Sequence, residues 1–152
     1  MNPAKAAEIL NLYIRQSHEL LNALRAEYAS FRANDISGFE AATSLKLDLS
    51  ATIQTTERQL YQTLEQDGYP ADQAGLNQYV DGLGLQNKYK ILMATAKDCQ
   101  KQNQINARMV NLATVQTQQF LNLLQGREPG TSLYSAAGKL VDNGSCSDTK
   151  TA

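Results

Sequence analysis

Apolar residues recur along most of this chain at alternating steps of four and three positions. In its first part the steps join Leu10, Ile14, Ser17, Leu21, Leu24, Tyr28 and Phe31. Such steps place side chains on one face of a helix and form the seam along which long helices pack in coiled coils. Asn2 can cap this helix, and Pro3 fits its first turn. The pattern predicts a long first helix that ends where Asn34 and Asp35 interrupt it.

A second run has the same spacing. Its members are Phe39, Ala42, Leu45, Leu49, Ile53, Thr56, Leu60 and Leu64. At its start, Ser37 and Glu40 have the spacing of a capping box, in which each side chain bonds a backbone N–H of the first turn. At its end, Gly68 suits a left-handed C-cap and Pro70 prevents the helix from continuing. We therefore expect a second long helix that stops at residues 67–70.

The third run is the longest. Its members are Leu85, Tyr89, Leu92, Ala96, Cys99, Asn103, Asn106, Val110, Ala113, Thr117, Phe120 and Leu124. Gly126 and Pro129 end it, and a short helical segment around residues 72–81 connects it to the second run. Short turns make neighbouring helices antiparallel. The sequence therefore predicts an all-α fold, an antiparallel up-down-up bundle of three long, coiled-coil-like helices with one short connecting helix.

The composition changes at Arg127. Gly, Ser, Thr and Asn dominate from there, interrupted only by two apolar pairs, Leu133 with Tyr134 and Leu140 with Val141. Such a segment buries too little apolar surface to offset the entropy lost on ordering. We expect two parts, a helical bundle domain over residues 1–126 and a flexible C-terminal tail over residues 127–152.

Charge and hydropathy argue against some classes of partner and indicate the cellular compartment. Lys and Arg number 14 and Asp and Glu 15, which gives a net charge of −1 and no basic excess for nucleic acid or an anionic membrane. Charged residues interrupt every apolar stretch before it reaches the ~18 residues of a membrane span, and the start does not resemble a signal peptide. We expect a cytoplasmic protein in which Cys99 and Cys146 are reduced.

The residues that could carry chemistry are isolated. A di-metal centre in a bundle uses Glu-x-x-His pairs, but Arg15 stands three residues before His18, the chain's one histidine. His18 could instead accept a phosphoryl group, although we interpret it as a solvated or seam-flanking side chain. Cys99 lies on a seam without a plausible base, and Gly82 and Gly84 lack the third glycine of a phosphate loop. The sequence predicts no enzyme, metal or cofactor.

Asn103 and Asn106 place two amides on the seam of the third helix. Amides on a seam lower stability unless they are hydrogen-bonded, and they often fix the register of helices. One interpretation is that the pair sets register within the bundle, and the other is that it contacts a bound partner.

A second apolar stripe accompanies this seam. Its members are Ile105, Met109, Leu112 and Leu123. The stripe either lets the third helix contact both other long helices, or it forms a groove wall for the amphipathic helix of a partner. In the second case Met109 would supply an adaptable contact.

Three segments carry a resemblance to a known family. Residues 46–60 contain a lysine and spaced leucines that lead into a Glu-Arg pair. Residues 103–109 are similar to an Asn-Gln-x-Asn-Gly segment, with Ala107 in place of the glycine. Residues 133–138 are similar to a Leu-Tyr-Gly-x-x-Gly element of a C-terminal tail. In these segments, in helix order and in length, the chain resembles the FlgN family of flagellar type III export chaperones.

The resemblance implies a function and its partners. Chaperones of this family hold the terminal amphipathic helix of the hook–filament junction proteins FlgK and FlgL and deliver them to the export gate. The family's tail tyrosine docks on the gate protein FlhA, and Tyr134, beside Leu133, has the corresponding position. Ser135 and Ala137 depart from the family element. The alternative from another class is a structural coiled-coil adaptor that has no clients.

Overall fold

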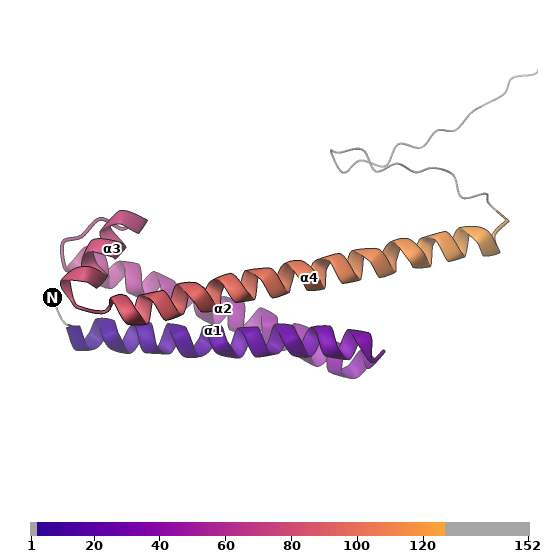
Figure 1. Ribbon diagram of the computed structural model, residues 1–152, viewed down its shortest axis with the longest axis horizontal. Coiled ribbons are helices and arrows are strands. Elements are labelled where there is room, and N and C mark those ends of the chain that lie inside the picture. The colour runs from indigo at the N-terminus through magenta and orange to yellow at the C-terminus, as the bar shows by residue number, and fades with distance from the viewer. Residues whose placement is uncertain (1–2, 127–152) are drawn as a thin grey trace, which may run out of the picture. The chain divides into compact units, whose positions relative to one another are not determined.

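The computed structural model describes residues 3–126, and the regular structure in that range is entirely α-helical. The helices in chain order are α1 (Pro3–Arg32), α2 (Ile36–Gln66), α3 (Gln73–Gly82) and α4 (Gln86–Leu124). The order of two long helices, one short helix and a third long helix confirms the predicted all-α fold (Figure 1).

Helices α1 and α2 pack closely as an antiparallel pair (Figure 1). Near the middle of α1, Gln16 accepts a buried hydrogen bond of 2.8 Å from Thr56 of α2. Towards the end of α1, Thr43 donates one of 3.0 Å to Glu27. From the first bond to the second, the residue numbers rise on α1, from 16 to 27, and fall on α2, from 56 to 43. The two helices therefore run in opposite directions, as predicted.

The turn between α1 and α2 corrects the prediction of a capping box. Asn34 adopts a left-handed φ of 55°, and Asp35 is the N-cap of α2. The Asp35 carboxylate accepts a hydrogen bond of 3.0 Å from the Gly38 N–H, so Ser37 lies inside the first turn and does not cap it. Aspartate caps a helix as well as serine does, and here it stands two positions earlier. A Cβ at Gly38 would lie 2.2 Å from Asp35 Oδ2, so the capping carboxylate would have to shift to admit a larger residue.

The larger core cluster joins α1, α2, α3 and the start of α4. Its buried members are Ala6, Leu10, Leu60, Leu64, Leu76, Tyr79, Val80 and Leu92. Tyr79 has 1% of its surface exposed and donates a hydrogen bond of 2.7 Å to Asp67 Oδ2. Burial and the Asp67 carboxylate both raise the pKa of Tyr79, so its phenol stays protonated. Gly68 adopts a φ of 86° just after α2, which confirms the predicted left-handed C-cap.

The first part of α4 packs along α1 in the same direction. The Cys99 thiol donates to the Ser17 carbonyl at 3.3 Å, and Asn106 donates to the Leu24 carbonyl at 2.8 Å. The two contacts are seven residues apart on both helices, so the chains run parallel here. Leu21, Leu24 and Cys99 form a second, smaller core cluster between the two helices. Cys99 is thus a buried structural thiol, and burial raises its pKa.

The chain separates into two compact units, Met1–Val110 and Asn111–Ala152, and α4 contributes residues to both. In the first unit the predicted seams match the buried faces, except at Leu45, Ala96, Asn103 and Val110, where the prediction was wrong. Leu45 is exposed, because its neighbours Thr43 and Lys46 face α1 and bond Glu27. Ala96 is exposed and Thr95 is buried in its place.

Candidate partner-binding surface

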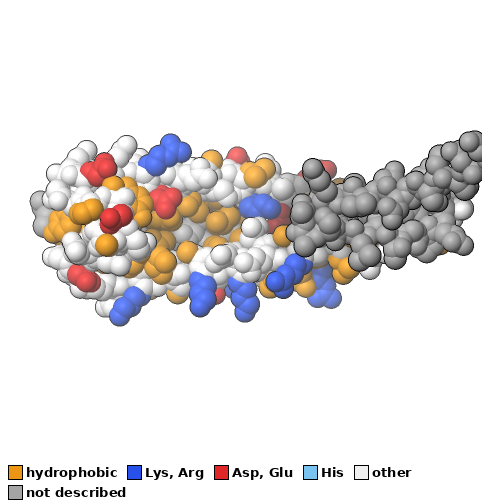
Figure 2. All heavy atoms as spheres, turned by 90° about the horizontal axis from the view of Figure 1, so that it is seen from above, with side chains coloured by type: hydrophobic (Ala, Val, Ile, Leu, Met, Phe, Trp, Pro, Cys, Tyr) orange, Lys and Arg blue, Asp and Glu red, His pale blue; other side chains and the backbone are white. Residues whose placement is uncertain are grey.

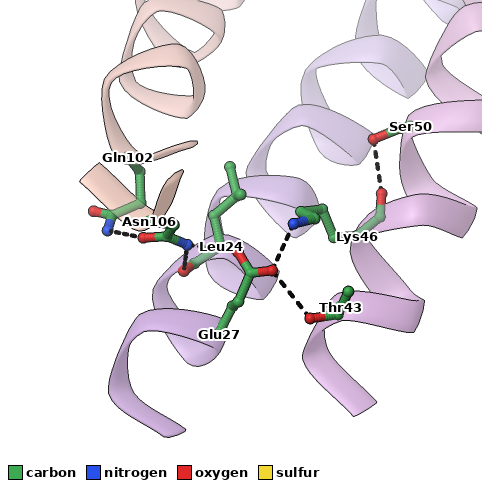
Figure 3. A network of polar contacts seen from close by, with 7 residues as sticks. All are labelled: Leu24, Glu27, Thr43, Lys46, Ser50, Gln102 and Asn106. Atoms are coloured by element: carbon green, nitrogen blue, oxygen red, sulfur yellow. Dashed lines mark hydrogen bonds and ion pairs between the residues drawn. The ribbon is translucent and has the colours of Figure 1, made fainter. Parts of the chain in front are cut away.

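A buried carboxylate links three helices of the first unit. Glu27 on α1 has 3% of its surface exposed (Figure 3). Its Oε1 accepts hydrogen bonds from Thr43 and Lys46 of α2, and Lys46 also forms an ion pair with it. Its Oε2 accepts a hydrogen bond of 2.7 Å from Asn106 Nδ2 of α4. A single side chain therefore fixes α2 and α4 to the same level of α1.

The charge of Glu27 depends on these partners. Burial alone raises the pKa of this carboxyl, but the hydrogen bonds from Lys46, Asn106 and Thr43 and the charge of Lys46 lower it below its usual value. Glu27 is thus ionised at neutral pH and paired with a cation, as a buried charge must be to be tolerated.

The structure gives Asn103 and Asn106 different environments. Asn106 has 3% of its surface exposed, and its amide bonds the Leu24 carbonyl, Glu27 and Gln102. These bonds are the ones that a register-setting amide makes, and they leave Asn106 no surface open to a partner. Asn103 is exposed, in contrast to its predicted place on the seam.

Asn103 lies at the rim of a groove between α2 and α4. The groove has a volume of about 250 Å³ and is lined by Leu20, Leu24, Lys46, Ser50, Cys99, Gln100 and Asn103. Apolar side chains gather along the middle of the face seen in Figure 2. Its apolar lining comes from α1 and from Cys99, and its polar rim includes Lys46 and Asn103.

The two halves of the second apolar stripe belong to different units. In the first unit, Ile105 is 37% exposed and Met109 is half-buried. In the second unit, Leu112 is 61% and Leu123 62% exposed. None of the four residues is buried, so the structure leaves open the partner-facing interpretation of the stripe.

The last part of α4, residues 111–124, exposes every large apolar side chain that it contains. These are Leu112, Val115, Phe120, Leu121, Leu123 and Leu124, with exposed fractions from 41% to 68%. Phe120 and Leu124 were predicted to be seam residues buried in the bundle, as was Val110 at 38% exposure, and this prediction is wrong. Because the sequence spacing continues unbroken while burial does not, these positions form a helical face without a cover inside the described residues.

Other candidates from the sequence stand as follows. His18 is exposed on α1, as a solvated histidine would be. Within residues 3–126, no group of three or more His, Cys, Asp and Glu side chains could hold a metal ion. Over the same range, no helix is both long enough and apolar enough to cross a membrane. Leu133 and Tyr134 lie outside the described residues.

Glu27 was missed by the sequence reasoning, although a signal for it exists. It stands three residues after Leu24 and four before Phe31, which is the spacing of the seam itself. A carboxylate in such a position requires a cation and donors opposite it. Lys46 and Asn106, both inside segments that carried the family resemblance, supply them.

Comparison with known families now adds a decisive finding. The family described as FlgN protein matches residues 1–142. The chain belongs to the FlgN family. Membership supports a role as a flagellar export chaperone, and FlgN is a family of chaperones, not of enzymes. No curated protein and no solved structure shows a significant match to the chain.

Proposed function

We propose that this FlgN-family protein is a cytoplasmic export chaperone for hook–filament junction proteins of the FlgK and FlgL kind. It holds their terminal amphipathic helix, prevents premature assembly and delivers them to the flagellar type III export gate. The observation that carries this proposal is the family match over residues 1–142. The uncovered apolar side chains of residues 111–124 support it, because a helix that must receive another helix needs such a face.

The client surface that we propose centres on Leu112 and Leu123. They are eleven residues apart, about three helical turns, and so lie on one face of α4. Each exposes more than half of its surface. Apolar anchors of this size contribute roughly 1–3 kcal/mol each when a partner buries them fully. Ile105 and Met109, which belong to the unit Met1–Val110, are further proposed client-binding residues.

The test is calorimetric titration of purified FlgK- and FlgL-type proteins into the chaperone. We expect Leu112→Asp to weaken client binding by at least about tenfold, because it removes an anchor and places a charge on the apolar face. Gln118→Asp is the matched control, since it adds the same charge at an exposed polar position of the same segment, about 120° around the helix from Leu112. Helicity should be unchanged in both variants. Unchanged affinity of Leu112→Asp contradicts the proposed surface, and failure of the wild-type protein to bind either client favours a client-free adaptor.

Delivery to the gate rests, in this proposal, on Tyr134 and its neighbour Leu133 in the C-terminal segment. An aromatic residue among polar neighbours can serve as the anchor of a short recognition element. We expect Tyr134→Ala to keep client binding and to weaken docking of the loaded chaperone on the cytoplasmic domain of FlhA by about 2 kcal/mol, some thirtyfold. Titration of the loaded variant into that domain measures it, and wild-type affinity would exclude Tyr134 as the anchor.

A further inference from the structure

The outward face of α4 carries a straight row of cations, which we call the basic ridge. It consists of Lys90, Lys97, Lys101 and Arg108. The spacings of seven, four and seven residues return each side chain to within about 20° of the same direction around the helix. At ~1.5 Å per residue the ridge is about 27 Å long. All four residues belong to the unit Met1–Val110.

The ridge faces away from the core. Leu92, Cys99 and Asn106, which are buried against α1, lie roughly on the opposite side of α4. The four cationic residues are all exposed. The ridge is therefore a surface feature that contributes nothing to the packing of the bundle.

The charges of the ridge are not balanced locally. Within residues 3–126, none of its four side chains forms an ion pair or a hydrogen bond, whereas Lys46 is paired with Glu27 and Lys88 bonds Asn11. The one acidic residue of α4, Asp98, stands three residues before Lys101 without forming an ion pair with it, so the four cations of the ridge have a single carboxylate beside them on α4. Ordinary solvent-facing helix surfaces mix both signs, and pairs of opposite charge stabilise them. A ridge of one sign in a protein with a net charge of −1 is a departure from that rule.

The spacing of the ridge indicates the shape of its partner. Steps of seven residues match the heptad repeat of two helices that lie side by side. Charged residues that flank the seam of such a pair determine which helices associate. Exposed apolar residues flank the ridge, with Met93 at 49% on one side and Ile91 at 50% on the other. Neighbouring cations are about 6–10 Å apart along the helix, within about one Debye length at 0.1 M salt, so their potentials add. A single narrow row fits an acidic helix better than the broad surface of a nucleic acid or a membrane.

We propose that the basic ridge is a second docking surface, which receives an acidic helix of a protein partner with Asp or Glu at matching heptad spacing. No residue belongs both to the ridge and to the proposed client surface, although the two adjoin where Arg108 stands three residues after Ile105. Charge pairs of this kind mainly raise the association rate and make it depend on salt.

The test uses the full chain and a synthetic helical peptide of about 22 alanine-rich residues, whose glutamates repeat the seven–four–seven spacing. Titration is followed by NMR of the backbone amides at low salt. We expect shifts centred on residues 90–108, and binding that weakens by about tenfold in the double variant Lys97→Glu/Lys101→Glu. The control Arg15→Glu/Arg58→Glu makes the same change in net charge at exposed residues of α1 and α2 and should bind the peptide like the wild type.

Three results overturn the proposal. In the first, a peptide of the same composition with its glutamates spread around the helix binds equally well, which indicates attraction by net charge alone. In the second, single-stranded DNA or vesicles that contain phosphatidylglycerol bind the ridge more tightly than the matched peptide does. In the third, the amide signals of residues 67–81 shift as the concentration of the protein itself is raised without peptide. That result indicates that the ridge binds a second copy of the chain through Asp67, Asp72 and Asp81. Circular dichroism verifies that both double variants are folded.

Discussion

Two stretches of α4, residues 86–110 and 111–124, have similar patterns and different surroundings. Both place large apolar residues at steps of three and four. In the first stretch Leu92 and Cys99 are buried against the other helices, and Asn106 is tied to α1 by hydrogen bonds. In the second stretch every large apolar side chain is exposed, up to 68% for Leu124.

A seam pattern in the sequence therefore predicts a helical face but does not predict what covers that face. Burial of apolar surface is favourable whether the covering helix belongs to the same chain or to another. Polar residues mark where this chain covers its own seam, because Asn106 and Glu27 need defined partners and find them in α1, α2 and α4. Beyond Val110 the described part of α4 contains no buried polar residue, and all its large apolar side chains are exposed.

The largest expected difference between the packed core and residues 111–124 is the loss of unfolding free energy when a leucine is replaced by alanine. Leu64 in the larger core cluster has no exposed surface, and Leu123 is 62% exposed. We expect Leu64→Ala to lower the free energy of unfolding by about 2–5 kcal/mol, since it leaves a cavity, and Leu123→Ala by about 0.5 kcal/mol or less. Urea unfolding followed by circular dichroism measures both. Equal losses would show that residues 111–124 are packed as firmly as the core.

A smaller effect tests the polar link between the helices. Glu27→Gln removes the ion pair with Lys46 and should lower the free energy of unfolding by about 1–3 kcal/mol at neutral pH. The exposed Glu40 provides a matched control, because Glu40→Gln removes the same charge from α2 without breaking a contact. If the two variants lost equal stability, the buried network would contribute nothing beyond net charge.

The pH dependence of the same variant has a definite sign. The pKa of Glu27 is lower in the folded protein than its ordinary value of 4.5. Its stabilisation is therefore complete above that ordinary pKa and is lost as the pH falls through the folded pKa. The difference in unfolding free energy between wild type and Glu27→Gln should shrink below about pH 4. A difference that stays constant through this range would mean that the Glu27 charge is not what stabilises the junction.

Much of the fold could be predicted from the sequence, because long four–three runs specify helices and turn residues specify their ends. Gly68 and the short α3 are examples that the structure confirms. The sequence did not show which of two neighbouring residues would take a given cap or seam position. Asp35 and Ser37 are both good caps, and only the turn at Asn34 selects the first. Leu45 lost its predicted seam position because its neighbours bond Glu27, a contact nineteen residues distant in sequence.

The candidate site was predictable in part. The choice between register and partner for Asn103 and Asn106 could not be made from spacing, because both amides occupy seam positions. In the structure one points to Leu24 and Glu27, and the other reaches the groove rim. Family resemblance supplied the proposed clients and the role of Tyr134, which no pattern of apolar residues contains.

We propose that residues 111–124 of α4 bind the client, whereas residues 86–106 belong to the bundle. Hydrogen exchange with mass spectrometry tests it directly, with and without a purified FlgK-type client. Helical segments with few buried contacts open easily, so residues 111–124 should exchange fast in the free protein and become protected when the client binds. Residues 86–106 should be protected in both states. Client binding that leaves exchange in residues 111–124 unchanged would contradict the account.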